Sequence, residues 1–174
     1  MSLATGFVVP EQFPVTLLCC AILCVECFGC GMYIGMKARP RTFTKEHMEQ
    51  FKEEHQKAFP KGEPAVGGWP DAGDGRYSDK LPYKTWVEFN NAMRVHMNFV
   101  EMLPVILFTL ILGGLFVPVV TMWVAIVNTV ARLIYTYSYL TKGSNSRYLG
   151  AVAGSLPLYI ILIWTVVKLF TLAF

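Results

Sequence analysis

The residues best suited to chemistry lie in an otherwise apolar stretch, FNNAMRVHMNFVEMLP, from Phe89 to Pro104. Arg94, Asn98 and Glu101 stand at positions i, i+4 and i+7, so on a helix they form one polar stripe. Charged groups within a membrane helix are costly, and they usually face a bundle interior or a water-filled cavity. The stripe therefore indicates either a bound polar ligand or an interhelical network that only fixes packing.

Four apolar segments must position such residues. The chain has 174 residues, 54% of them hydrophobic, and a mean hydropathy of +0.44, which is too apolar for an ordinary soluble domain. A helix of about 20 apolar residues spans a bilayer. The sequence predicts an all-α membrane protein, a single domain over residues 1–174 with four transmembrane helices at about 13–36, 84–116, 119–140 and 147–173.

The basic residues are unevenly placed along the chain. They cluster in the loops after the first and third predicted spans, and the turn after the second span has none. By the positive-inside rule, both basic loops, including an extended loop over residues 41–83, face the cytosol. Basic residues confined to such loops do not form a nucleic-acid footprint, so we expect no nucleic-acid partner.

A second polar stripe lies in the third predicted span. Asn128, Arg132, Tyr135 and Tyr139 stand at i, i+4, i+7 and i+11, which again places them on one helical face. With the predicted topology, both stripes lie toward the cytosolic half of the bundle. Because the two stripes share one half of the membrane, a ligand site is favoured over pure packing.

The first predicted span carries one ionisable group, Glu26, which we expect to pair inside the bundle. Residues 1–12 lack the basic start and cleavage site of a removed signal peptide, so this span is expected to be an uncleaved anchor. The span also holds all five cysteines, which we interpret as packing residues, with no metal site: Cys19, Cys20, Cys24, Cys27 and Cys30.

The loop between the first two spans has its own local signals. Pro40 is expected to end the first helix, and Thr44 can cap a short helix from Lys45 to Phe59. The stretch GGWPDAGDGR, residues 67–76, is rich in turn formers. It lacks both a preceding strand and a following GK[ST], so it does not indicate a phosphate-binding loop.

The two stripes resemble motifs of the MAPEG family, the four-helix membrane proteins of eicosanoid and glutathione metabolism. The second-helix signature of that family, R-x-x-x-N-x-x-E-x-x-P, is matched by Arg94, Asn98, Glu101 and Pro104. Residues 131–139, ARLIYTYSY, resemble its third-helix pattern A-R-L-x-Y-x-x-x-Y. Within the family, the RVH core and the preceding FNNA are most similar to the microsomal glutathione S-transferases of the third type.

The resemblance implies a homotrimer that holds glutathione between neighbouring protomers, in a site open to the cytosol. Guanidinium groups would clamp the carboxylates of glutathione, a carboxylate would take its ammonium group, and phenols would wall the cavity. Arg147 is the implied catalytic residue, which stabilises the glutathione thiolate. The implied glutathione-binding residues are Arg39, Arg94, Asn98, Glu101, Arg132, Tyr135 and Tyr139.

The sequence departs from the family pattern at three points. Met97 stands where many members carry Gln or Arg, and Pro40 replaces an arginine of the leukotriene-forming members, which argues against leukotriene synthesis. The spacing from Tyr139 to Arg147 also differs slightly from that of those members. Lys142 is the alternative cation for the thiolate if Arg147 does not reach it.

The predicted function is a membrane-bound glutathione transferase or peroxidase acting on lipophilic electrophiles or lipid hydroperoxides, with glutathione as cosubstrate and no metal. We expect the membrane to be that of the endoplasmic reticulum or the mitochondrion. Two other hypotheses stay open at this point. One is a non-catalytic accessory subunit or scaffold of a larger membrane complex, and the other is a proton or ion path through Glu26.

Overall fold

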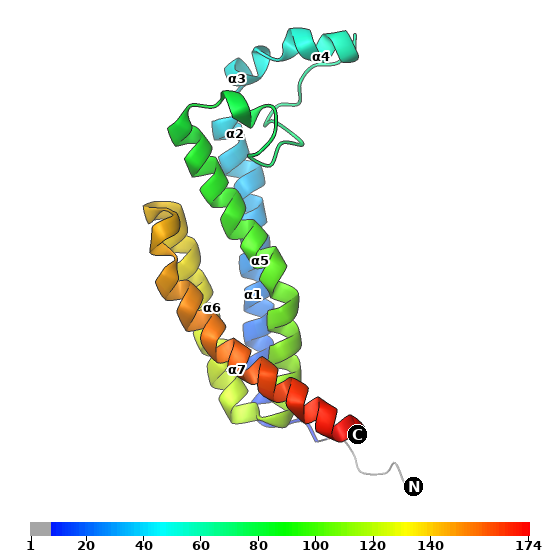
Figure 1. Cartoon of the computed structure of the whole chain (residues 1–174), viewed down its shortest axis with the longest axis vertical. Helices are drawn as coiled ribbons and strands as arrows, with labels where there is room; N and C mark the ends of the chain where they lie inside the picture. The colour runs from blue at the N-terminus through cyan, green and yellow to red at the C-terminus, as the bar shows by residue number, and fades with distance from the viewer. Residues whose placement is uncertain (1–7) are drawn as a thin grey trace.

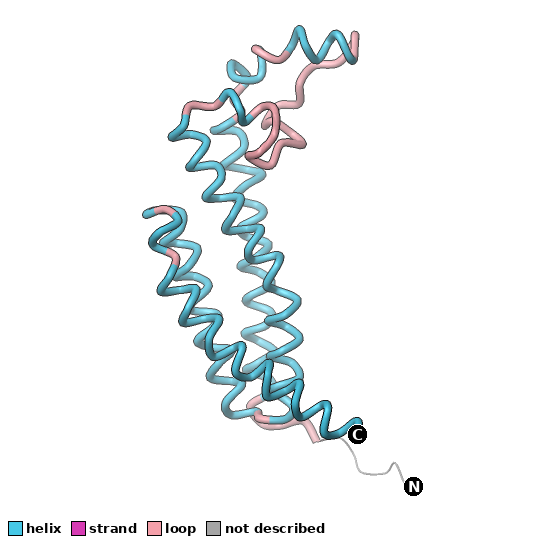
Figure 2. The backbone as a smooth tube through the Cα atoms, in the orientation of Figure 1, coloured by secondary structure: helices cyan, strands magenta, loops and turns pink. Residues whose placement is uncertain are grey.

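The computed structural model describes residues 8–174, and in that range the chain forms helices and loops without a strand (Figure 2). Residues 1–7 of the predicted domain lie outside the described residues. Four helical stretches are long and apolar enough to cross a membrane, which confirms the predicted four-helix architecture. They are α1 (Phe13–Tyr33) with its continuation to Thr42, α5 (Tyr83–Phe116), α6 (Pro118–Lys142) and α7 (Tyr148–Ala173).

The four long helices alternate in direction. In Figure 1, α1 and α5 run alongside each other, and α6 and α7 form a hairpin that packs against them. The loop between α1 and α5 and the short connection between α6 and α7, which contains η3 (Ser144–Ser146), lie toward the same end (Figure 1). Both basic loops are therefore on one side of the bundle, as the charge pattern requires.

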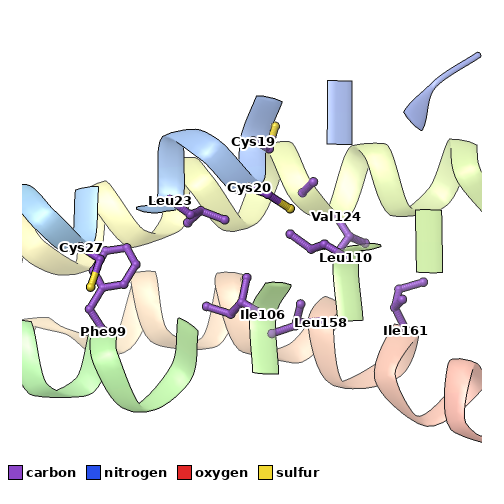
Figure 3. Packing of buried hydrophobic residues seen from close by; sticks show 11 residues of the cluster. Cys19, Cys20, Leu23, Cys27, Phe99, Ile106, Leu110, Val124, Leu158 and Ile161 are labelled. Carbon is purple, nitrogen blue, oxygen red and sulfur yellow. The ribbon is translucent and has the colours of Figure 1, made fainter. Parts of the chain in front are cut away.

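The apolar centre of the bundle is shared by all four long helices. Figure 3 shows the thiol of Cys27 beside the ring of Phe99, and the side chains of Ile106 and Leu158 close together. Three of the five cysteines are buried here and pack as expected, whereas Cys24 is exposed and Cys30 is partly buried. The cluster includes Cys19, Cys20, Leu23 and Cys27 of α1, Phe99, Ile106 and Leu110 of α5, Val124 and Ala125 of α6, and Leu158 and Ile161 of α7.

Two glycines let α7 lie unusually close to α6. A Cβ atom on Gly150 would stand 2.5 Å from the backbone N of Tyr135 and 2.7 Å from the backbone O of Ala131. One turn later, the backbone O of Gly154 accepts a hydrogen bond of 2.9 Å from Nδ2 of Asn128. Because small residues permit this backbone contact, the polar face of α6 is held at a fixed distance from the start of α7.

The first span does not end at Pro40 as expected. The helix continues through a π-helical turn, η1 (Ile34–Ala38), into α2 (Arg39–Thr42), where Pro40 lies in the first turn. The backbone N–H of Arg39 donates to the O of Ile34, five residues back. We attribute the continuation to this wider turn, which accommodates a proline that has no N–H to give to the helix.

The loop carries two short helices where one was expected. Thr44 caps the first as predicted, with its side chain accepting a 3.2 Å hydrogen bond from the N–H of His47. The helix then breaks, because Gln50 turns its side chain back to donate to the O of His47 at 2.7 Å. The segments are α3 (Lys45–Glu49) and α4 (Lys52–Ala58), followed by η2 (Ser78–Lys80) before α5 begins.

Candidate functional site

The two predicted stripes meet through one hydrogen bond between α5 and α6. Nη1 of Arg132 donates to Oδ1 of Asn98 at 2.9 Å, and the guanidinium carbon lies 4.1 Å from the centre of the Phe99 ring. Arg132 is only 7% exposed, and its Nε and Nη2 atoms are buried without a hydrogen-bond partner among residues 8–174. Unsatisfied donors are costly in an apolar bundle, so this guanidinium has capacity for an added acceptor.

One and two turns after Arg132, two buried tyrosines continue the polar face of α6 toward the end of the bundle that carries the basic loops. The rings of Tyr135 and Tyr139 lie 5.5 Å apart. The guanidinium carbon of Arg147, at the start of α7, lies 5.7 Å from the ring centre of Tyr139, and its Nη1 donates to the O of Ser144 at 3.1 Å. We call this line of residues the polar seam, which consists of Asn98, Arg132, Tyr135, Tyr139 and Arg147.

The remaining two members of the α5 stripe lie outside the seam. Arg94 and Glu101 are exposed, whereas their neighbours Val95 and Phe99 are buried against the other helices. In the described part of the chain no ion pair joins Glu101 to Arg132, because Asn98 takes the guanidinium instead. The α5 stripe therefore divides into Asn98, which faces α6, and two charged groups on the outer surface of the chain.

Arg39, an implied glutathione ligand, is placed away from the seam and is 2% exposed. Its Nη1 donates to the O of Gly67 at 3.1 Å and of Gly68 at 3.4 Å, and its Nη2 donates to the O of Asp71 at 2.6 Å. The guanidinium carbon also lies 3.6 Å from the centre of the Trp69 ring. The loop has folded back over the end of the first span and uses the donors that glutathione was expected to bind.

Sequence reasoning missed the carboxylate that organises this loop, Asp71. Its Oδ1 accepts from the N–H of Gly73 at 2.7 Å and of Gly75 at 3.2 Å, and its Oδ2 accepts from the N–H of Tyr77 and of Ser78, each at 2.8 Å. Burial alone would raise the pKa of Asp71, but these hydrogen bonds outweigh it and hold the pKa below its ordinary value. The sequence feature that could have revealed this turn is an aspartate followed by glycines two and four residues later.

Glu26 also departs from expectation. It was predicted to pair inside the bundle, yet both of its carboxylate oxygens are buried without a partner among residues 8–174. Arg132, the buried arginine of the bundle, gives its Nη1 to Asn98, and no ion pair joins it to Glu26 among residues 8–174. Glu26 therefore makes no hydrogen bond to the polar seam.

The comparison with protein families agrees with the motifs. The model of the MAPEG family matches residues 16–167, a range that includes parts of all four spans and every residue of the polar seam. Together with the four long apolar helices, this match identifies a multi-pass integral membrane protein with a general role in glutathione or eicosanoid metabolism. The chain belongs to the MAPEG family.

Proposed function

We propose that this protein is a membrane-bound glutathione transferase, with glutathione peroxidase activity toward lipid hydroperoxides, of the kind found in the third type of microsomal transferase. Membership of the family supports the general role. The observation that carries the specific proposal is the guanidinium of Arg132, which is buried with two unused donor atoms beside Tyr135 and Asn98. An anionic, peptide-like ligand supplies the acceptors that these donors lack.

The charges of glutathione match the charges around the seam. Its carboxylates would bind Arg132 and Arg94, its ammonium group would bind Glu101, and Asn98 would bond a peptide group. Tyr135 and Tyr139 would form the wall and donate hydrogen bonds. Arg39 stays a predicted ligand, but both of its Nη atoms already donate to loop carbonyls, and only its Nε is without an acceptor among residues 8–174.

The exposed positions of Arg94 and Glu101 bear on where glutathione binds. Charged side chains on the surface of a spanning helix are costly against lipid, so they are expected to face a neighbouring protomer. We therefore place glutathione between protomers of a homotrimer. The side that carries the basic loops would face the cytosol, where glutathione is supplied.

Arg147 is the proposed catalytic residue. A free thiol has a pKa of about 8.5, so only a small part of it is ionised at neutral pH. A guanidinium beside the sulfur stabilises the thiolate, and each unit of lowered pKa is worth about 1.4 kcal/mol. Nη1 of Arg147 donates to the O of Ser144, and its other nitrogens have no hydrogen-bond acceptor among residues 8–174, so they can serve the sulfur.

The thiolate would then react in one of two ways. It would attack an electrophilic carbon and form a sulfur–carbon bond, while the bond from that carbon to a leaving group, a ring oxygen or a conjugated double bond breaks and the released anion takes a proton. Alternatively, two glutathione molecules would be oxidised to the disulfide while a hydroperoxide is reduced to an alcohol and water. In both cases the acceptor is apolar and would enter from the bilayer, while glutathione enters from the aqueous side.

Calorimetric titration of the purified protein with glutathione, together with the ultraviolet absorbance of the bound thiolate, tests this proposal. Arg147→Ala should lose the thiolate absorbance and keep most of the affinity, whereas Lys142→Ala, at the exposed end of α6, should keep both. Absence of glutathione binding to the wild-type protein would refute the transferase proposal. Loss of the absorbance in Lys142→Ala alone would transfer the catalytic role to that lysine.

A further inference from the structure

Two groups of opposite charge inside the bundle are both short of hydrogen-bond partners. The carboxylate oxygens of Glu26 on α1 have none among residues 8–174, and neither do Nε and Nη2 of Arg132 on α6. In the described spanning helices, Glu26 is also the one acidic residue whose side chain is not exposed. The other buried carboxylate of the described chain, Asp71, belongs to the loop. The bundle thus encloses one potential anion and one cation.

The packing around Phe99 places Glu26 and Arg132 in the same region. Cys27, which follows Glu26 in the chain, shares a buried cluster with Phe99, and Figure 3 shows its thiol beside the Phe99 ring. The guanidinium carbon of Arg132 lies 4.1 Å from the centre of that ring. Part of Glu26 also borders a small apolar cavity together with Leu133, which follows Arg132. The carboxylate oxygens themselves are enclosed by protein.

Opposite charges in an apolar interior stabilise each other beyond contact distance. None of the ion pairs among residues 8–174 joins Glu26 to Arg132, yet the two groups act on each other electrostatically. Coulomb energy falls only as the inverse of the distance, and buried charges are weakly screened. The other titratable groups that act on Arg132 are thiols and a phenol, which are ordinarily neutral at pH 7: Cys27, Cys30 and Tyr135.

We infer that Glu26 is the buried counter-ion of Arg132, a positioning residue that holds the guanidinium in the bundle and lowers its attraction for an anionic ligand. The inference rests on the proposed glutathione site and adds to it a residue of α1. An uncompensated arginine within the membrane is costly, and the carboxylate reduces that cost. The consequence is a ligand affinity below the maximum, because the guanidinium meets glutathione with its charge already partly compensated.

This arrangement predicts a change whose sign separates charge from packing. The full-length protein is titrated calorimetrically with glutathione, a net anion, and separately with its glycine ethyl ester, which has one carboxylate fewer. Glu26→Gln keeps the shape and removes the charge, so it should bind glutathione about tenfold more tightly than the wild type, the order expected for a unit charge acting through protein. The ester should gain less. A packing defect would weaken both ligands.

Two further variants control for the position and for the charge. Glu26→Asp keeps the carboxylate and should bind glutathione more like the wild type than like Glu26→Gln. Glu88→Gln removes an exposed carboxylate from α5 and should leave both affinities unchanged.

Thermal unfolding of a double-mutant cycle tests the pair without a ligand. Glu26→Gln should lower the unfolding midpoint of the wild-type protein, because Arg132 is left without its counter-ion. In the background of Arg132→Gln, the same change should leave the midpoint unchanged or raise it, because it then removes a lone buried carboxylate. A purely structural role of Glu26 would lower both midpoints equally.

Unchanged or weaker glutathione binding by Glu26→Gln would overturn the inference, and so would an equal gain for glutathione and its ester. Equal losses of midpoint in the two backgrounds would overturn it as well. If the wild type binds no glutathione, the proposed function fails, and the cycle alone decides whether Glu26 and Arg132 are a charge pair. If Arg132→Gln does not fold, the comparison of glutathione with its ester decides it.

Discussion

Two buried arginines of this protein have opposite local environments. Arg39 is 2% exposed and donates to three backbone carbonyls of the loop, whereas Arg132 is 7% exposed and has one acceptor, Asn98. The resemblance to the family implies both as glutathione ligands, and residue type and spacing alone cannot show how many of their donors the fold already uses. The loop acceptors of Arg39 lie 28–32 residues away along the chain, beyond the reach of any local pattern.

Asp71 gives the loop a stability that depends on pH. Its pKa is held below the ordinary value in the folded state, so its contribution is complete above the unfolded pKa of about 3.9 and is lost as pH falls through the folded pKa. We expect the loop to lose protection as pH falls below about 4. Hydrogen exchange of the amides of Gly73, Tyr77 and Ser78, corrected for the intrinsic rate, measures this loss.

The variant Asp71→Asn tests whether this carboxylate causes the pH dependence. It removes the charge to which these N–H groups donate, so the loop amides should be less protected from exchange at neutral pH. Their protection should also no longer fall on acidification. Asp74→Asn changes an exposed carboxylate three residues later and should behave like the wild type. If Asp71→Asn keeps the wild-type pH dependence, another group controls the acid sensitivity of the loop.

At the scale of the elements, the long helices were predictable and the loop was not. Long apolar runs define the four spans, so their existence and order follow from hydropathy, with ends within a few residues of those observed. The largest error concerns the C-terminal end of the first span. That helix runs on to Thr42, because a π-helical turn accommodates Pro40. The loop depends on contacts between Asp71, Arg39 and distant backbone groups, which periodicity does not reveal.

The close contact between α6 and α7 predicts that substitution of Gly150 lowers the stability of the protein. The atoms that an added Cβ would meet, at 2.5 Å and 2.7 Å, belong to the backbone of α6, which cannot move aside as a side chain can. Gly150→Ala should therefore destabilise the protein by about 1–3 kcal/mol, as overpacking does. Thermal unfolding in detergent measures the change.

Gly35→Ala is the matched control on another membrane helix. A Cβ atom at this position meets nothing within 4 Å, so the variant should be as stable as the wild type or slightly more stable, because alanine favours a helix by roughly 0.5–1 kcal/mol over glycine. Equal midpoints for Gly150→Ala and the wild type would show that α6 and α7 are free to separate.

At the scale of the whole molecule, the single chain leaves polar groups exposed on a spanning helix. Arg94 and Glu101 lie on the surface of α5, and each charge placed at the centre of a bilayer costs about 2.5–3.5 kcal/mol by insertion scales. The apolar surface elsewhere on the spans is suited to lipid. The face of α5 that carries these charges is therefore the face where another protomer is expected.

Native mass spectrometry of the purified protein should detect an assembly of three 19.6 kDa chains. Glu101→Lys, which reverses a charge on this face, should shift the distribution toward the single chain. Glu88→Lys changes an exposed carboxylate near the start of the same helix and should keep the trimer. A single chain in the wild-type sample at every detergent concentration would contradict the proposed assembly, whatever the outcome of glutathione binding.

The hydrogen bonds from Arg39 to the carbonyls of Gly67, Gly68 and Asp71 join the end of the first span to the middle of the following loop. Residues 67–71 should consequently move with the first span as one rigid body, and not as a free tether. A pair of spin labels at Ala72 and at Lys142, both exposed, would then give a narrow distance distribution. Arg39→Ala would broaden that distribution while the span itself stays helical.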